Sequence, residues 1–231
     1  MASDSFFLRF SWGPRKEALE QCADRLRRFL VDIGAVDPTF TAWRNGRRAG
    51  ENIHFPPNME QLQRLLAEGV NRKDIGNEIM PDLGFSVSLL AAEDDTAMTL
   101  GMHCGVYSHW NRNVCSIVFP TDGKVADRIL QTSVLTAIAK AVVRNWEPEY
   151  GVITSHHCSK LTSPKSFETE AGWVTYLSPN SPKLPAIPKP AMVESVDHGE
   201  LVISTNDRFS SGNPEHVKTV QRLSLLFASN S

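Results

Sequence analysis

The segment 102–115, with the sequence MHCGVYSHWNRNVC, holds the residues of this chain whose types could do chemistry. His103, Cys104, His109 and Cys115 could ligate a metal ion, or could pair a thiol nucleophile with a base. Apolar and polar residues alternate here, however, so Cys104 joins an apolar row while His103 lies on the opposite face of a strand. Neighbours on a strand cannot chelate one ion without a bulge. We therefore interpret Cys104 and Cys115 as small core residues.

A second candidate for metal binding or catalysis is the run His156-His157-Cys158. It has no second ligand cluster at a recognisable spacing, and a polar strand end is the simpler interpretation. The chain also contains no phosphate loop, dinucleotide fingerprint, nucleophile elbow or zinc-protease helix. We therefore predict no catalytic, cofactor-binding or metal-binding residues. A small metal-dependent hydrolase or nuclease that uses His103, His156, His157 or Cys158 stays open as the alternative.

Several predicted turns carry residues that suit contact with another protein. An exposed tryptophan is a common anchor in such contacts, and acidic groups speed the approach of a basic partner. The segments concerned are the turns at 92–96 and 108–113, the loop at 157–171 and the irregular stretch at 43–55. The residues that we predict to bind a partner are Glu93, Asp94, Asp95, His109, Trp110, Glu168 and Glu170. A solvated turn is the competing interpretation of the three residues at 93–95.

The apolar periodicity predicts the elements that position these residues. Alternation predicts strands over 6–12, an antiparallel meander over 85–119, and further strands at 150–156, 172–178 and 199–207. Helical spacing predicts four helices: over 19–33 (ended by Gly34), between the cap Asn58 and the C-terminal Gly69, over 122–146, and from Pro214. Residues 37–57 look irregular, and the proline-rich stretch 179–190 looks like an extended connection. The fold class is α+β, a mostly antiparallel sheet of about six to seven strands packed with three to four helices.

Composition sets the class of protein. The chain has 231 residues, 41% of them hydrophobic, and a formal net charge of -2, which suits one soluble domain spanning residues 1–231. There is no basic excess for nucleic acid and no apolar run long enough for a membrane. No secretory signal is recognisable, and the four scattered cysteines indicate reduced thiols. We therefore expect a cytoplasmic protein; its oligomeric state is left open.

Ordered motifs along nearly the whole chain resemble one family. They are FSWGPRKEALEQCADRLRRFL, DPTFTAW, LLAEGVNRKD followed by LGFSVSL, CGVYS, NVCSIVFP, WEPEYGVITS, WVTYLS, GELVISTNDRF and NPEHV. Each is weak alone, but as an ordered set they make the chain resemble the bacterial immunity protein 52 family.

The resemblance implies an antidote that binds and neutralises a cognate secreted toxin of a polymorphic or type VI secretion system. The usual toxin neighbours of this family have a restriction-endonuclease-like domain, so the expected partner is a DNase effector and the chain itself is not an enzyme. The resemblance supplies no catalytic residues and does not identify the toxin-facing surface. A structural subunit without a toxin partner is a third hypothesis.

Overall fold

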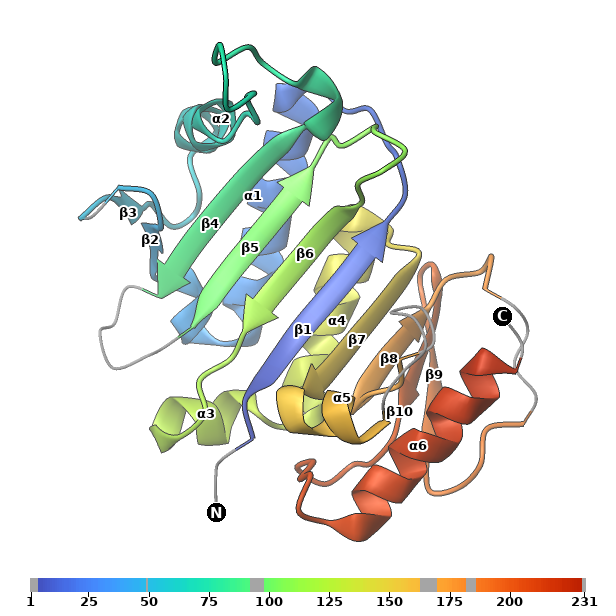
Figure 1. The fold of residues 1–231 in the computed structure, drawn as a ribbon. Helices are drawn as coiled ribbons and strands as arrows, with labels where there is room; N and C mark the ends of the chain where they lie inside the picture. The colour runs from blue at the N-terminus through green and yellow to red at the C-terminus, as the bar shows by residue number, and fades with distance from the viewer. Residues whose placement is uncertain (1–3, 49, 92–97, 163–169, 182–185, 230–231) are drawn as a thin grey trace. The chain divides into compact units, whose positions relative to one another are not determined.

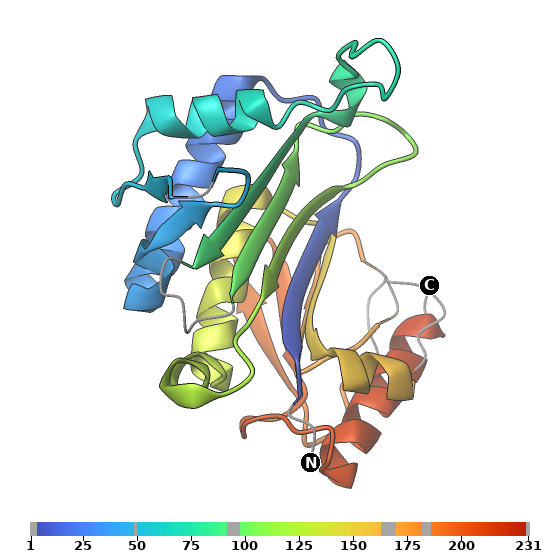
Figure 2. The same cartoon turned by 60° about the vertical axis from the view of Figure 1, so that its left-hand side comes forward.

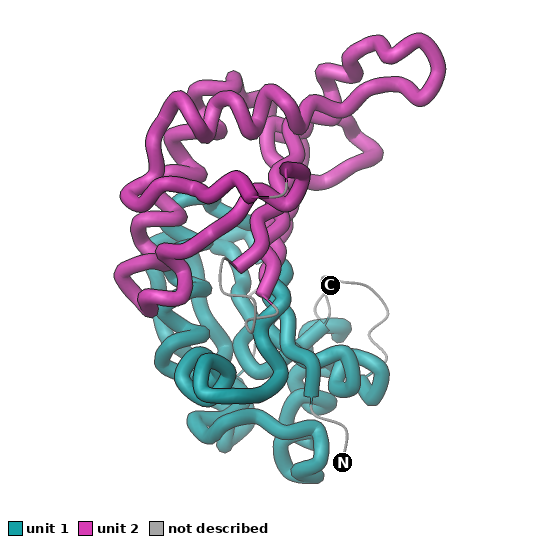
Figure 3. The backbone as a smooth tube through the Cα atoms, turned by 90° about the vertical axis from the view of Figure 1, so that its left-hand side faces the viewer, with its two compact units in different colours: residues 1–10, 118–231 teal, residues 11–117 magenta. Residues whose placement is uncertain are grey.

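The protein is an α+β fold with more strands and helices than the sequence predicts. The computed structural model describes residues 4–48, 50–91, 98–162, 170–181 and 186–229. These residues form ten strands, six α-helices and two short 3-10 helices, against the expected six to seven strands and three to four helices. The strand order is β3-β2-β4-β5-β6-β1-β7-β8-β10-β9. Two compact units are distinguished, residues 1–10 with 118–231 (unit 1) and residues 11–117 (unit 2) (Figure 3). The prediction of one domain stays a prediction.

Unit 2 has one face of its sheet covered by a helix and the other open. Helix α1 (Leu19–Val36) lies behind strands β4 and β5 in Figure 1. Its apolar side chains are buried, and Cys22 hydrogen-bonds to Cys104 of β5. Burial alternates along β4, where Val87 and Leu89 are buried and Ser88 is exposed. The elements of this unit are β2 (Trp43–Asn45), β3 (Asn52–Ile53), α2 (Met59–Glu68), β4 (Phe85–Ala91), β5 (Thr99–Cys104), most of β6 (Asn113–Val118), and the 3-10 helices η1 (Pro38–Thr41) and η2 (Pro81–Leu83).

The predicted meander and the predicted cap of α2 are confirmed. Strands β4 and β5 pair in antiparallel fashion, with Val87 opposite Met102. The side chain of Asn58 accepts a hydrogen bond from the backbone N–H of Glu60, which is the capping interaction that an asparagine provides at a helix start.

Two predictions in unit 2 were wrong. Helix α1 does not end at Gly34 but continues to Val36, and the ring of Phe55 lies so close to Gly34 that a Cβ there would meet it at 2.6 Å. Glycine is therefore needed for close packing and not as a helix end. Residues 37–57 are not irregular throughout, because Trp43 is buried in β2, which pairs with β4. This strand is too short to show a period.

Unit 1 buries both faces of its central strands. Every residue of β7 (Tyr150–Ser155) and β8 (Val174–Leu177) is buried. Figure 1 shows α4 (Thr132–Trp146) behind these strands, with α5 (His156–Thr162) and α6 (Pro214–Ala228) in front. The predicted start of α6 is confirmed, since the Asn213 side chain accepts from the Glu215 N–H. The remaining elements are α3 (Gly123–Ile129), β9 (Met192–Val196) and β10 (Gly199–Ile203), with β1 (Phe6–Trp12) entering both units.

Three predictions in unit 1 need correction. The helix expected over 122–146 is two helices, α3 and α4, separated at Leu130 and Gln131. The run His156-His157-Cys158 is the first turn of α5 and not a strand end, so the loop predicted at 157–171 is partly helical. Strand β9, which follows the proline-rich stretch and pairs with β10, was not predicted.

Candidate functional site

The cysteines that could have served as nucleophiles are all buried. Cys22, Cys104, Cys115 and Cys158 are free thiols in the protein interior. Burial raises the pKa of Cys158 to about 11 and raises the pKa of Cys115 well above its ordinary value. The hydrogen bond between the Cys104 thiol and Cys22, followed by burial, raises the pKa of Cys104. The thiolate is the reactive form, so Cys104, Cys115 and Cys158 are poor nucleophiles.

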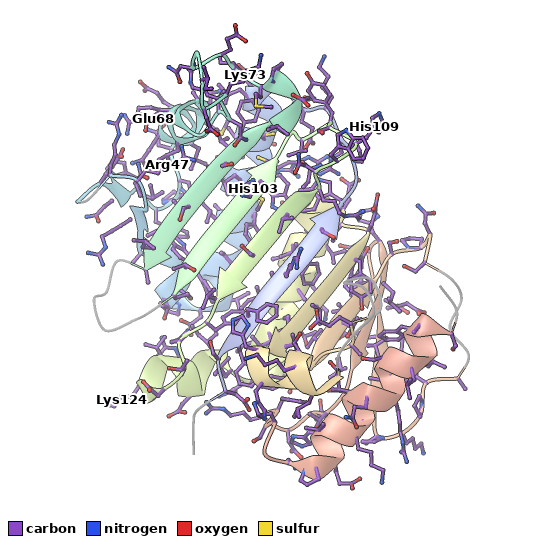
Figure 4. The ribbon with its side chains drawn as sticks, viewed as in Figure 1. Arg47, Glu68, Lys73, His103, His109 and Lys124 are labelled. Atoms are coloured by element: carbon purple, nitrogen blue, oxygen red, sulfur yellow. The ribbon has the colours of Figure 1, made fainter. Side chains whose placement is uncertain are left out.

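The histidines next to Cys104 and Cys158 in the sequence are exposed, while those thiols are buried. His103 lies on the open face of β5, opposite in direction to Cys104, with its ring nitrogen Nδ1 3.2 Å from the Ser86 hydroxyl oxygen (Figure 4). Partial burial, and then the charge of Arg47, lowers the pKa of His103. His156 and His157 are exposed at the start of α5, in unit 1. Within the described ranges, no group of three or more His, Cys, Asp or Glu side chains is placed to hold a metal ion.

The acidic residues predicted to bind a partner are differently placed. Glu93, Asp94, Asp95 and Glu168 lie outside the described residues. Glu170 is only 6% exposed, so its carboxylate offers little surface to another protein. Burial raises the pKa of Glu170. A hydrogen bond with Ser159 and the charges of Arg9 and His156 partly oppose this rise. A role for these residues in binding stays a prediction.

His109, labelled in Figure 4, and the adjacent Trp110 belong to the loop between β5 and β6, which lies at one end of unit 2 (Figure 1). Both are exposed, and Trp110 is 92% exposed. The Trp110 backbone N–H donates to the Ser108 hydroxyl at 3.3 Å. A tryptophan with almost no protein contact contributes little to the core, so its large apolar surface is available to a partner.

A buried amide fixes the shape of this loop. The Asn113 side chain accepts from the Val106 N–H at 2.9 Å, and donates to the Val106 carbonyl at 3.0 Å and to the Gly13 carbonyl at 2.7 Å. Asn113 is fully buried. The loop is therefore held at its base while Trp110 projects at its end.

Sequence reasoning missed a second exposed apolar segment in the same unit. Ile75 is 90% exposed and Ile79 is 52% exposed, both between α2 and η2. The only sequence signal was the pattern RKDIGNEI, in which isoleucines are surrounded by charged and turn-forming residues without helical or strand periodicity.

The family model described as Immunity protein 52 matches residues 4–229. The chain belongs to the Immunity protein 52 family. The match covers essentially all of the sequence, so both compact units are part of the family's architecture.

A solved structure shares the fold of this Immunity protein 52 member. The structure titled Pseudomonas aeruginosa T6SS protein PA0821 superposes with a TM-score of 0.52 at 8% sequence identity, over 94% of this chain and 76% of that one. At this identity the likeness shows a shared fold. No curated protein matches the sequence. Among the described helices of this family member, none is long and apolar enough to cross a membrane.

Proposed function

We propose that this protein neutralises a cognate secreted toxin by binding it, and so protects the cell that produces both. The observation that carries the proposal is the family match over residues 4–229, since an immunity protein acts on a partner toxin. The buried, weakly acidic thiols fit a protein that binds and does not catalyse. The likeness to a T6SS protein supports delivery of the toxin by a type VI system.

The proposed toxin is a DNase with a restriction-endonuclease-like domain, and the proposed site of protection is the cytoplasm. The DNase is what the family resemblance of the ordered motifs implies, and the cytoplasm follows from the reduced state expected of the four scattered cysteines. Inhibition by a surface that complements the toxin's shape is favoured over mimicry of DNA, because the net charge is only -2.

Co-expression tests the function directly. The toxin domain encoded next to this chain, produced in a sensitive host, should stop growth, and co-expression of this chain should restore it. The purified proteins should form a complex in which the toxin no longer cleaves DNA. Continued toxicity together with no stable complex would contradict the proposal.

Charge reversal at Asp94 and Asp95 tests the predicted acidic contacts. If these residues bind the toxin, the reversal should weaken the affinity for the toxin, and the loss of affinity should be largest at low salt.

The hydrolase alternative makes a different prediction. It requires turnover of a substrate by the isolated chain, lost on substitution of His103, His156, His157 or Cys158. Turnover that survives purification and disappears with one of these changes would replace the binding function with an enzymatic one.

A further inference from the structure

The segment between α2 and η2 presents apolar side chains from an ordered turn. Ile75 and Ile79 have exposed fractions of 90% and 52%. Gly76 and Asn77, directly after Ile75, both have positive φ, at 85° and 55°. Two consecutive residues in this region form a tight turn, and glycine and asparagine adopt it at the lowest cost. Ile75 therefore lies at the tip of a turn whose backbone shape is set by its sequence.

Hydrogen bonds hold this turn in place. The Lys73 N–H donates to the Glu78 carbonyl at 2.9 Å, and the Met80 N–H donates to the Asn71 carbonyl at 2.8 Å. The side chains of Lys73 and Glu78 form an ion pair at 2.7 Å. A turn fixed before binding loses little conformational entropy when it docks, which favours affinity.

The turn is joined to the loop that carries Trp110. The carbonyl oxygen of Asp82 accepts from the backbone N–H groups of Tyr107 and Ser108, at 2.9 Å and 3.0 Å. Gly84 has a φ of 58°, and a Cβ there would lie 2.3 Å from the Cys104 carbonyl oxygen. The two loops therefore meet at the same end of the β4–β5 pair, as Figures 1 and 2 show.

The charges around Ile75 indicate what kind of surface it contacts. The stretch 71–80 contains two basic residues, Arg72 and Lys73, and two acidic residues, Asp74 and Glu78, so it has no net charge. Nucleic acid and anionic lipid surfaces are bound through a basic excess, which this turn lacks. A neutral turn with an isoleucine at its tip instead complements an uncharged apolar hollow on a protein.

We propose that Ile75, Ile79 and Trp110 form the apolar contact surface for the cognate toxin, with a hollow on the toxin receiving the side chain of Ile75. This assignment rests on the proposed function. It adds the 71–80 turn to the predicted contact of Trp110, and it makes burial of apolar surface, rather than charge attraction, the main source of affinity.

The test compares four forms of the full-length chain for binding to the purified toxin domain: wild type, Ile75→Asp, Trp110→Asp and Leu225→Asp. Leu225 is the matched control, because it is 72% exposed on α6 in unit 1 and receives the same change. We expect the toxin dissociation constant to rise at least tenfold for Ile75→Asp and for Trp110→Asp, and to stay at the wild-type value for Leu225→Asp. The differences should persist between about 50 mM and about 300 mM salt.

All three substituted residues are exposed, so thermal unfolding midpoints should match wild type and separate lost contact from lost folding. Wild-type affinity for both Ile75→Asp and Trp110→Asp would overturn this surface and leave the function standing. Absence of binding and protection by the wild type would overturn both. Binding to anionic vesicles, or self-association, that Ile75→Asp abolishes would assign the surface to a membrane or a second copy, and would also overturn it.

Discussion

The side chain of Asn113 replaces backbone pairing at the point where β5 gives way to the loop that carries Trp110. Its amide forms three hydrogen bonds to backbone groups of Val106 and Gly13, without access to water. Buried backbone groups of this kind are costly when unpaired. One residue thus determines whether the end of unit 2 keeps its shape.

Replacing Asn113 with alanine should lower the free energy of unfolding by about 3 kcal/mol, because buried donors and acceptors lose their partners. Urea denaturation followed by circular dichroism measures the change. Asn111→Ala is the control, since Asn111 is exposed on the same loop and its loss should change stability by less than about 0.5 kcal/mol. If the two variants lowered the free energy of unfolding equally, the buried hydrogen bonds of Asn113 would add nothing to stability beyond what an exposed asparagine adds.

Glu170 makes stability depend on pH. Burial raises its pKa in the folded protein, so the unfolded chain releases this proton first as pH rises. Ionising the buried carboxyl therefore costs folding stability. This cost is absent below the pKa of Glu170 in the unfolded chain, grows as pH rises toward its pKa in the folded protein, and is constant above that value. Glu170→Gln should therefore be more stable than wild type at neutral pH, with the difference shrinking toward pH 4. Unfolding curves across this range measure it, and a difference that grows on acidification would contradict the assignment.

At the scale of elements, burial pattern follows from what covers each strand. Strand β4 alternates between buried and exposed residues because α1 covers one face, and its period is legible in the sequence. Strands β7 and β8 are buried along their whole length, between α4 and the pair α5 and α6 (Figure 1). Their sequences carry apolar and small polar residues without a simple period.

Gly84 allows η2 to approach the end of β5, and this contact should be sensitive to a single methyl group. Gly84→Ala adds a Cβ that would lie 2.3 Å from a backbone oxygen at a positive φ. We expect a loss of about 3 kcal/mol or more in unfolding free energy, from overpacking combined with backbone strain. Gly76→Ala is the control, since its φ is also positive but no atom lies within 4 Å of the added group. It should lose only about 1 kcal/mol. If both variants lost a similar amount of unfolding free energy, backbone strain alone would explain the effect of Gly84→Ala.

The same physics explains how much could be predicted from the sequence. Strand β1, the β4–β5 pair and the capped starts of α2 and α6 were predicted, because one-sided burial and caps leave local signals. The split between α3 and α4 was not predicted, since apolar residues continue through Leu130. Strands β2 and β3 have only three and two residues, and β9 has no buried residue, so none of the three shows a clear apolar alternation.

The candidate site was predicted in part. Trp110 stood out as a tryptophan in a turn-like context, and the structure shows that it is exposed. Ile75 did not stand out in the sequence, because whether an isoleucine is exposed depends on which other segments of the fold pack over it. The burial of Glu170 was not foreseen for the same reason, since an acidic residue in a polar stretch is typical of a surface.

For the whole molecule, binding should appear as stabilisation. A toxin that binds only the folded chain, present at a free concentration about 100 times its dissociation constant, adds about 2.7 kcal/mol to the unfolding free energy. For a chain of 231 residues this corresponds to a rise of about 5–10 °C in the unfolding temperature. Differential scanning fluorimetry with and without toxin measures the shift, and Ile75→Asp should reduce it. Without toxin, EDTA should leave the unfolding temperature of the chain unchanged; a fall on chelation would point to the metal-dependent hydrolase alternative.

The path of the chain through unit 1 has a consequence for synthesis on the ribosome. Residues 1–10 belong to unit 1, but the rest of that unit begins only at Val118, and β7, the neighbour of β1 there, begins at Tyr150. At about 5–20 residues per second, the first strand emerges on the order of 10 s before that neighbour. Throughout that interval the nascent chain carries Phe6, Leu8 and Phe10 without their unit 1 neighbour, which makes its N-terminal strand a natural substrate for chaperones during translation.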